Sequence, residues 1–131
     1  MFPIKAAALA EAFRVLRPGG ALVACDVVSG TGDALHFPVP WGSEEMTHLV
    51  DIETLGTLVG DAGFRLDSLK DETRVTVDWW QAMKSRPPGG AKPLSPLVIF
   101  GADAARKVAN LMRNLAEDRV REVVLIAVKP G

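Results

Sequence analysis

Two histidines with a tryptophan between them are the residues best suited to acid–base chemistry. His36 and His48 flank Trp41 in a polar stretch. Because imidazole changes charge near neutral pH, either could take a proton from a substrate hydroxyl or amine. We name His36 as the candidate catalytic base; the alternative is a pair of solvated loop histidines. Glu44 and Glu45 lie between them, but histidines 12 residues apart match no recognised ligand spacing, so no metal site is predicted.

Aromatic and thioether side chains are the candidates for an apolar substrate pocket. Trp41 lies in the polar stretch, and Trp79, Trp80 and Met83 lie in a predicted helix. Adjacent helical residues point about 100° apart, so Trp79 and Trp80 cannot both face one core stripe. One of them is expected to meet a loop, a lid or a partner. The alternative is that these side chains are ordinary core residues.

Charged side chains offer two weaker signals. Asp26 sits near the end of the apolar run 21–28 and is a candidate substrate contact; it could equally hydrogen bond to the backbone of the following loop. A local positive excess could attract an anionic substrate group, or it could be a solvated face. Its members are Lys84, Arg86, Lys92, Arg106, Lys107 and Arg113.

The apolar run 21–28 is followed by Gly30-Thr31-Gly32, which invites comparison with a dinucleotide-binding loop. The third glycine of that motif is missing. Pro38 and Pro40 stand where a helix N-terminus would hold a phosphate. The segment is therefore interpreted as a connector over the carboxyl ends of the strands, where ligands bind in α/β sheets.

Composition indicates one ordinary globular domain. The 131 residues are 48% hydrophobic and 24% charged, and the net charge of −1 favours neither a nucleic acid nor a membrane surface as partner. No apolar run is long enough for a membrane span. The single Cys25 excludes an internal disulfide, and its place in an apolar run predicts a buried side chain. Without a signal-peptide layout, a cytoplasmic location is expected.

Hydrophobic periodicity predicts an α/β fold. An amphipathic helix beginning at Pro3 ends at Pro18-Gly19-Gly20, and the run 21–28 has the pattern of a strand buried on both faces. After the loop 29–50, Asp51 can cap the next helix. The predicted elements that follow are a helix over 52–62, a strand over 64–73, helices over 73–86 and 103–118, and a strand over 121–131.

Three segments resemble class I S-adenosylmethionine-dependent methyltransferases. ALAEAFRVLRPGGALVACDVV is similar to the helix and PGG turn before their fifth strand, and DIETLGTLVGDAGFRLDSLKDET to the next helix and strand with its AGF junction. ARKVANLMRNLAEDRVREVVLIAVKP is similar to the lid helix and last strand. The resemblance implies a single domain over 1–131 with a partial Rossmann-like sheet of three strands, the last antiparallel, flanking helices, and a helical lid insertion over 74–119.

The resemblance is to the C-terminal half of small-molecule enzymes, of the sarcosine/dimethylglycine or natural-product type. It implies S-adenosylmethionine as cofactor. The glycine-rich turn and acidic residue that hold the cofactor lie upstream of the fifth strand in that family, so no residue of this chain is assigned to cofactor binding. The implied function is a small-molecule methyltransferase that needs a partner or an upstream segment. The alternative is a cofactor-free ligand-binding or dimerisation module.

An isolated half leaves the strand 21–28 without one of its neighbours. A long apolar edge strand with unpaired N–H and C=O groups favours pairing with another chain. We therefore expect a homodimer, or association with a complementary N-terminal half, through that edge.

Overall fold

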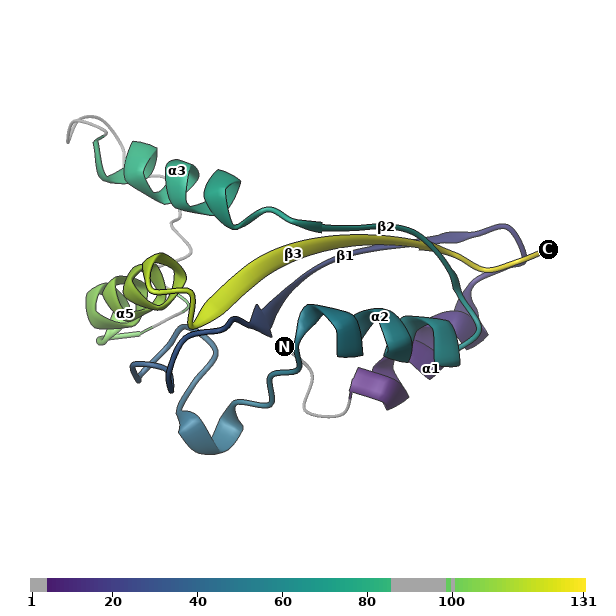
Figure 1. Cartoon of the computed structure of the whole chain (residues 1–131), viewed down its shortest axis with the longest axis horizontal. Helices are drawn as coiled ribbons and strands as arrows, with labels where there is room; N and C mark the ends of the chain where they lie inside the picture. Colours follow the sequence, from purple (N-terminus) through teal and green to yellow (C-terminus); the bar gives the residue numbers. More distant parts are fainter. Residues whose placement is uncertain (1–4, 86–98, 100) are drawn as a thin grey trace.

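The computed structural model describes residues 5–85, 99 and 101–131 and contains a three-stranded sheet flanked by helices (Figure 1). The strand order is β1-β3-β2, with β3 antiparallel to both neighbours. This confirms the predicted partial sheet with its last strand antiparallel. In chain order the elements are α1 (Lys5–Val15), β1 (Ala21–Ser29), the short 3-10 helix η1 (Glu44–Met46), α2 (Ile52–Asp61), β2 (Arg65–Asp71), α3 (Thr73–Lys84), α5 (Ala104–Ala116) and β3 (Val120–Val128).

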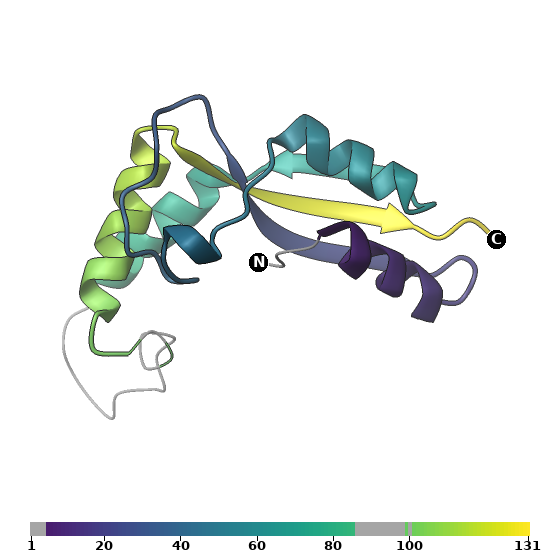
Figure 2. The ribbon, with the colours of Figure 1, turned by 90° about the horizontal axis from the view of Figure 1, so that it is seen from below.

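The register places the carboxyl ends of β1 and β2 at one edge of the sheet. β1 pairs with β3 from Ala21 opposite Val128 to Ser29 opposite Val120. β2 ends at Asp71, opposite Val123. The loop after β1 and helices α3 and α5 all gather at this edge (Figures 1 and 2). The edge is where α/β sheets place their ligands.

Helices α1 and α2 cover one face of the sheet and build the larger core, side by side in Figure 2. The Asp51 side chain accepts a hydrogen bond from Thr54 N at 2.7 Å, which confirms the predicted helix cap. The buried members of this core are Leu9, Val28, Leu55, Val59, Phe64, Val123, Leu125 and Ala127.

The AGF junction is explained by close packing against α1. Gly63 has a φ of 104°, which favours glycine, and a Cβ there would lie 2.9 Å from the Phe13 ring. Phe13 also meets Phe64 edge to face, with ring centroids 5.1 Å apart. The glycine therefore lets α1 approach the start of β2.

The PGG turn joins α1 to the end of β3. Gly19 N donates to the Lys129 carbonyl at 2.7 Å, and Lys129 N donates to the Gly20 carbonyl at 2.9 Å. The Lys129 ammonium donates to the carbonyls of Phe13 and Leu16 at 2.7 and 2.8 Å, at the C-terminal end of α1. A cation suits that end of the helix dipole.

Among the described residues, the other face of the sheet is covered at one end, where α3, α5 and the loop after β1 form a second cluster. Its buried members are Val27, Leu111, Leu115 and Val120. Towards the other end of β1, Val23 is 64% exposed and Cys25 is exposed as well. The predictions of a strand buried on both faces and of a buried Cys25 are therefore wrong for this chain, because α1 and α2 lie on the opposite face.

Parts of the predicted organisation lie outside the described residues. These are Pro3, the stretch 86–98 with Arg86 and Lys92, and residue 100. Within the predicted lid insertion 74–119, the structure describes most of α3 and all of α5 between β2 and β3. That this insertion acts as a lid within a single domain stays a prediction. Among the described residues, no helix is long and apolar enough to cross a membrane.

Truncating Leu55 is expected to destabilise the larger core. Leu55 is 2% exposed on α2, so Leu55→Ala removes packed methyl groups and leaves a cavity worth roughly 2–5 kcal/mol. Chemical denaturation measures the change. Val75→Ala, at a position 61% exposed, is the control and is expected to change the unfolding free energy by less than about 0.5 kcal/mol.

Candidate functional site

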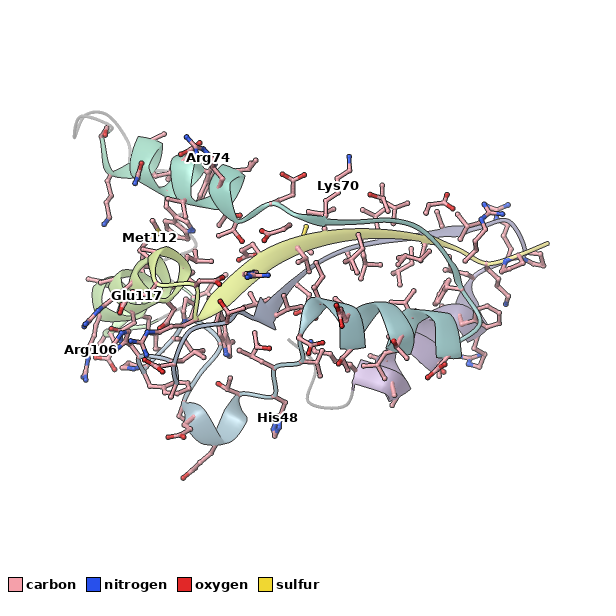
Figure 3. The ribbon with its side chains drawn as sticks, in the orientation of Figure 1. His48, Lys70, Arg74, Arg106, Met112 and Glu117 are labelled. Atoms are coloured by element: carbon pink, nitrogen blue, oxygen red, sulfur yellow. The ribbon has the colours of Figure 1, made fainter. Side chains whose placement is uncertain are left out.

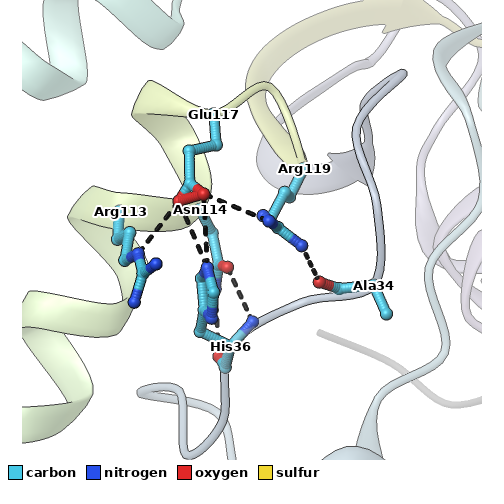
Figure 4. A network of polar contacts seen from close by, with 6 residues as sticks. All are labelled: Ala34, His36, Arg113, Asn114, Glu117 and Arg119. Atoms are coloured by element: carbon cyan, nitrogen blue, oxygen red, sulfur yellow. Dashed lines mark hydrogen bonds and ion pairs between the residues drawn. The ribbon is translucent and has the colours of Figure 1, made fainter.

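The loop after β1 is held against α5 by a buried asparagine (Figure 4). Asn114 is fully buried. Its Oδ1 accepts from His36 N at 2.8 Å, and its Nδ2 donates to the His36 carbonyl at 3.1 Å. Asn114 thus pairs with both the N–H and the C=O of His36. These two bonds fix the backbone position from which the His36 side chain extends.

Two further side chains hold the loop at neighbouring points. Asn110, one helical turn before Asn114, donates from Nδ2 to the Pro38 carbonyl at 2.8 Å. Arg119 donates to the Ala34 carbonyl from the far side of His36 (Figure 4). The loop is therefore attached to α5 and to the turn after it on both sides of the histidine.

His36 and Glu117 form a histidine–carboxylate pair. His36 Nε2 lies 3.2 Å from Glu117 Oε2 and 3.5 Å from Oε1. An ionised carboxylate only accepts hydrogen bonds, so Nε2 must carry the proton in this contact. The neutral ring then keeps its lone pair on Nδ1. A base oriented by a second group is the arrangement expected of general base catalysis.

Glu117 is kept ionised by its neighbours. Burial raises the pKa of this carboxyl, but hydrogen bonds from Arg119 and His36 and the positive charges of Arg119 and Arg113 outweigh it, so the pKa is lowered. Arg119 donates to Oε1 at 3.1 Å and Arg113 donates to Oε2 at 3.0 Å. Arg113, a member of the predicted positive excess, therefore has a structural partner.

The structure gives the Gly30-Thr31-Gly32 segment a packing role. Gly30 N donates to the Arg119 carbonyl at 3.0 Å and Gly32 N to the Asp118 carbonyl at 2.7 Å. A Cβ on Gly30 would lie 2.0 Å from the Asp118 carbonyl oxygen, and one on Gly32 would lie 2.7 Å from that of Glu117. The glycines are needed because the loop backbone touches the turn between α5 and β3.

Asp118 closes that turn. Its φ of 54° lies in the left-handed region, and its carboxylate accepts from Arg121 Nε at 2.7 Å and Nη2 at 2.9 Å. Thr31 donates to the same carboxylate from its hydroxyl and its backbone. Hydrogen bonds from Arg121 and then Thr31 hold the pKa of Asp118 far below its usual range.

Trp41 lies on the second core cluster, near the histidine. It is half-buried against the cluster of Val27, Leu111, Leu115 and Val120, and its Nε1 donates to Thr47 Oγ1 at 3.1 Å. This position serves packing and leaves the residue partly exposed.

The two adjacent tryptophans of α3 differ in exposure, as expected for neighbouring residues of a helix. Trp79 is 49% exposed, whereas Trp80 and Met83 are half-buried. The two tryptophans meet edge to face, with ring centroids 4.9 Å apart. Neither belongs to a core cluster of the described residues, although Val77 of the same helix packs on the second cluster.

Two candidates lie away from the other site residues. The Asp26 carboxylate is engaged on the α1 side of the sheet, where it pairs with the buried Lys5 and accepts from Val27 N at 2.8 Å. Burial, and then the charge of Asp26, raises the pKa of Glu122.

His48 is exposed after η1 and points away from the rest of the chain (Figure 3). His36, but not His48, therefore has a built environment.

Two hollows of the described surface contain none of the aromatic and thioether pocket candidates, although Asp26 lines the first. An apolar groove of about 450 Å³ lies between α1 and β1, far along the sheet from His36. A shallower hollow of about 680 Å³ opens between the end of β2, α3 and the end of α5. Its polar lining includes Asp71, Arg74 and Asp78. The second hollow lies at the carboxyl edge where a ligand is expected. No group of three His, Cys, Asp or Glu side chains suited to a metal occurs in the described ranges.

Asn114, Glu117 and Arg119 were not predicted from the sequence. A signal for the first existed: Asn110 and Asn114 are four residues apart and flank Leu111 beside the apolar stripe of α5. An amide there has to find a partner, because a buried polar group without one is costly. Which backbone it binds depends on the loop path, which sequence spacing does not specify.

Comparison with known proteins identifies the fold through structures alone. No protein-family model and no curated protein matches the chain. Phosphoethanolamine N-methyltransferase 2 from Haemonchus contortus, solved with phosphomonomethylethanolamine and S-adenosylhomocysteine, matches 98% of this chain at a TM-score of 0.60 and 15% identity, and the match covers 30% of that protein.

Two further structures match almost as completely. The StiE O-MT matches 98% of this chain at a TM-score of 0.61 and 18% identity, over 40% of its own length. The 4+2 cyclase SpnF matches 97% at a TM-score of 0.55 and 21% identity, over 44% of its length. The chain therefore has the fold of the C-terminal half of class I S-adenosylmethionine-dependent methyltransferases, and it spans less than half the length of each of these structures.

Replacing Asn114 is expected to release the loop. Asn114→Ala leaves the part-buried N–H and C=O of His36 without their Asn114 partners, which costs roughly 1–3 kcal/mol and should speed proteolytic cleavage within residues 30–50. Denaturation and limited proteolysis measure both effects. Asn110→Ala removes one bond to Pro38 and serves as the comparison. Equal effects of the two variants would contradict the central role of Asn114.

Asp118 is expected to contribute to stability at neutral pH and to lose that contribution in acid. Its folded-state pKa is depressed, so the stabilisation is fully present above the ordinary carboxyl value, roughly pH 4, and is lost as pH falls below it. Asp118→Asn tolerates the positive φ and removes the charge. Thermal melts from pH 7 to pH 2 should show a lower Tm for the variant at pH 7 and a difference from the parent that narrows below roughly pH 4. A constant difference at every pH would contradict the assignment.

Proposed function

We propose that this chain is the acceptor-side half of a small-molecule methyltransferase that uses S-adenosylmethionine. The observation that carries the proposal is the fold likeness over 94–98% of the chain to methyltransferases solved with S-adenosylmethionine or S-adenosylhomocysteine. The His36–Glu117 pair at the carboxyl edge of the sheet supports it, because that edge is where a substrate binds.

The described residues do not fit the methyl donor. The Gly30–Gly32 backbone is filled by the turn at Glu117 and Asp118, which leaves no space for a phosphate or nucleoside. Asp26, a carboxylate within β1 that could have taken ribose hydroxyls, is paired with Lys5 and Val27 N. The donor site is therefore assigned to the other half of the fold.

The contribution of this chain is on the acceptor side. A substrate amine or hydroxyl that gains a methyl group loses a proton, and His36 Nδ1 is the group placed to accept it. Glu117, through Nε2, orients the ring and stabilises the imidazolium that results. Most of the remaining rate enhancement in such transfers comes from positioning and exclusion of water.

The aromatic residues are the proposed contacts for the apolar part of the acceptor. Trp41 is fixed beside the histidine loop, and Trp79, Trp80 and Met83 lie on α3, within the proposed lid insertion over 74–119. The exposure of Trp79 leaves an aromatic face available for a ligand. Asp26 is withdrawn from the substrate contacts because its carboxylate is already engaged on the α1 side.

A second candidate is a cofactor-free ligand-binding or dimerisation module. The likeness to SpnF supports this second candidate, because SpnF has this fold and is named as a 4+2 cyclase, not as a methyltransferase. The His36–Glu117 pair and the aromatic residues would then bind a ligand without methyl transfer. Donor binding distinguishes the two candidates.

The test joins this chain to the polypeptide encoded directly upstream of it and titrates S-adenosylmethionine by calorimetry. Binding is expected for the joined protein and not for this chain alone, because the described residues offer the donor no site. Methyl transfer is then measured on a panel of small amines and hydroxyl compounds. His36→Asn should lower kcat roughly 100-fold with little change in donor affinity.

His48→Asn is the matched control, because His48 is exposed and points away from the site. It should leave kcat unchanged. Absence of donor binding by the joined protein would favour the cofactor-free module. Donor binding by this chain alone would contradict the assignment of the donor site to the other half.

A further inference from the structure

Arg121 is placed between carboxylates from two different parts of the chain. Its Nε donates to Asp118 Oδ1 at 2.7 Å and its Nη2 to Asp118 Oδ2 at 2.9 Å, in the turn between α5 and β3. Its Nε also lies 3.9 Å from Oδ2 of Asp71, the last residue of β2. Asp118, through its hydrogen bonds and its charge, and then Asp71, through its charge, raise the pKa of the Arg121 guanidinium, although burial opposes them. Both carboxylates therefore act on the same guanidinium.

Asp118 connects this guanidinium to the loop after β1. Its carboxylate accepts hydrogen bonds from the hydroxyl and the N–H of Thr31, and its carbonyl accepts one from Gly32 N at 2.7 Å. Thr31 and His36 belong to the same loop, and Glu117, the residue before Asp118, contacts the His36 ring. A displacement of Asp118 is therefore expected to move both the backbone that carries His36 and the carboxylate that orients its ring.

Asp71 connects the same guanidinium to α3. Its Oδ1 accepts a hydrogen bond from Thr73 N at 2.9 Å and another from the Thr73 hydroxyl, so it holds the first residue of the helix. Thr73 is also attached to β3, because Glu122 N donates to Thr73 Oγ1 at 3.0 Å. Glu72 N donates to the Glu122 carbonyl at 2.8 Å. The start of α3 is therefore fixed to β3 at the residue next to Arg121.

We propose that Arg121 is a positioning residue that couples α3 to the loop after β1, so that a change at the start of α3 moves His36. The coupling passes from Asp71 through Arg121 to Asp118. An acceptor that contacts the aromatic side chains of α3 thereby influences the position of the base. This last step rests on the proposed function, whereas the coupling itself does not require methyl transfer.

The chemistry of arginine suits this role. The planar guanidinium presents its N–H groups in fixed directions, so it can donate twice to one carboxylate while lying close to a second. Side chains that belong to one network of hydrogen bonds and ion pairs have non-additive effects on stability, whereas distant residues without a shared partner have nearly additive ones. The network therefore predicts coupling between Thr31 and Asp71, although no hydrogen bond joins these two described residues.

The histidine side chains are the probes for the coupling. The chain has two histidines: His36 lies in the site, and His48 is exposed and points away from the rest of the chain (Figure 3). Imidazole NMR signals are recorded for this chain and for Asp71→Asn. This variant removes the charge but keeps an oxygen that can accept from Thr73 N. We expect the His36 signal to shift and the His48 signal to stay in place.

Asp67→Asn is the matched control. Asp67 and Asp71 both lie on β2 and both have side chains that are 43% exposed, but Asp67 pairs with Arg65. Asp67→Asn should leave both histidine signals in place. In an Arg121→Gln background, Asp71→Asn should no longer shift the His36 signal. Arg121→Lys, which keeps the charge but not the planar fork, replaces Arg121→Gln if that variant fails to fold, as judged by its thermal melt.

A double-mutant cycle measures the same coupling as an equilibrium. Thr31→Val and Asp71→Asn are made singly and together, and chemical denaturation gives the unfolding equilibrium constant of each variant. The combined change should differ from the product of the single changes by roughly twofold or more, and should equal that product in the Arg121→Gln background. A His36 signal that ignores Asp71→Asn, or equality with the product in the parent background, would overturn the coupling. None of these readouts uses S-adenosylmethionine, so the proposed function holds or fails separately.

Discussion

The rest of the structure depends on the pairing of β3 with strands on both of its sides. β1 and β2 are not paired with each other; in the described sheet each is paired with β3. The alternate residues Val123, Leu125 and Ala127 are almost completely buried against α1 and α2, while Val120 is buried in the second cluster. Backbone pairing and side-chain burial thus converge on the last strand of the chain. Because its contacts with β1 span about a hundred residues of sequence, the fold has to close these long loops before the pairing stabilises it.

The strand order also determines where chemistry can occur. Since β3 runs against both neighbours, the connections that leave β1 and β2 emerge together, and α5 leads back into β3 at that same edge. The Asn114 contacts turn this proximity into a defined geometry, because they fix the backbone of His36 to a helix that is itself anchored by Leu111 and Leu115. A base on a loop is precise only to the extent that the loop is held. In this chain the same helix and the turn that follows it supply the attachment, the orienting carboxylate and its two arginines.

Elements were easier to predict than contacts. The periodicity of α5 and the cap at Asp51 are local signals, and both are found where the sequence places them. The Asn114–His36 contact joins residues 78 positions apart, so no local pattern contains it. The wrong prediction for Cys25 has a different cause. An apolar run does not tell which of its residues are covered, because exposure depends on which elements lie on each face of the strand. β1 therefore carries more apolar residues than the described part of this chain buries.

The exposed apolar residues of β1 lie where its outward N–H and C=O groups have no hydrogen-bond partner among the described residues. Soluble monomers rarely leave a contiguous apolar patch beside an open strand edge, because the combination promotes aggregation. Part of the β1 edge has hydrogen-bond partners. The Asp26 carboxylate accepts a hydrogen bond from Val27 N, and the Val50 carbonyl accepts one from Ser29 N. Those contacts protect the end of β1 nearest the histidine loop and leave the opposite end unprotected. Among the described residues, the carboxyl end of β1 is therefore covered, with the site built on α5, whereas Val23 and Cys25 towards its amino end are exposed. Asp26 marks the boundary between the covered and the exposed part of β1. Its ion pair with Lys5 places two charged groups at the margin of an otherwise apolar groove.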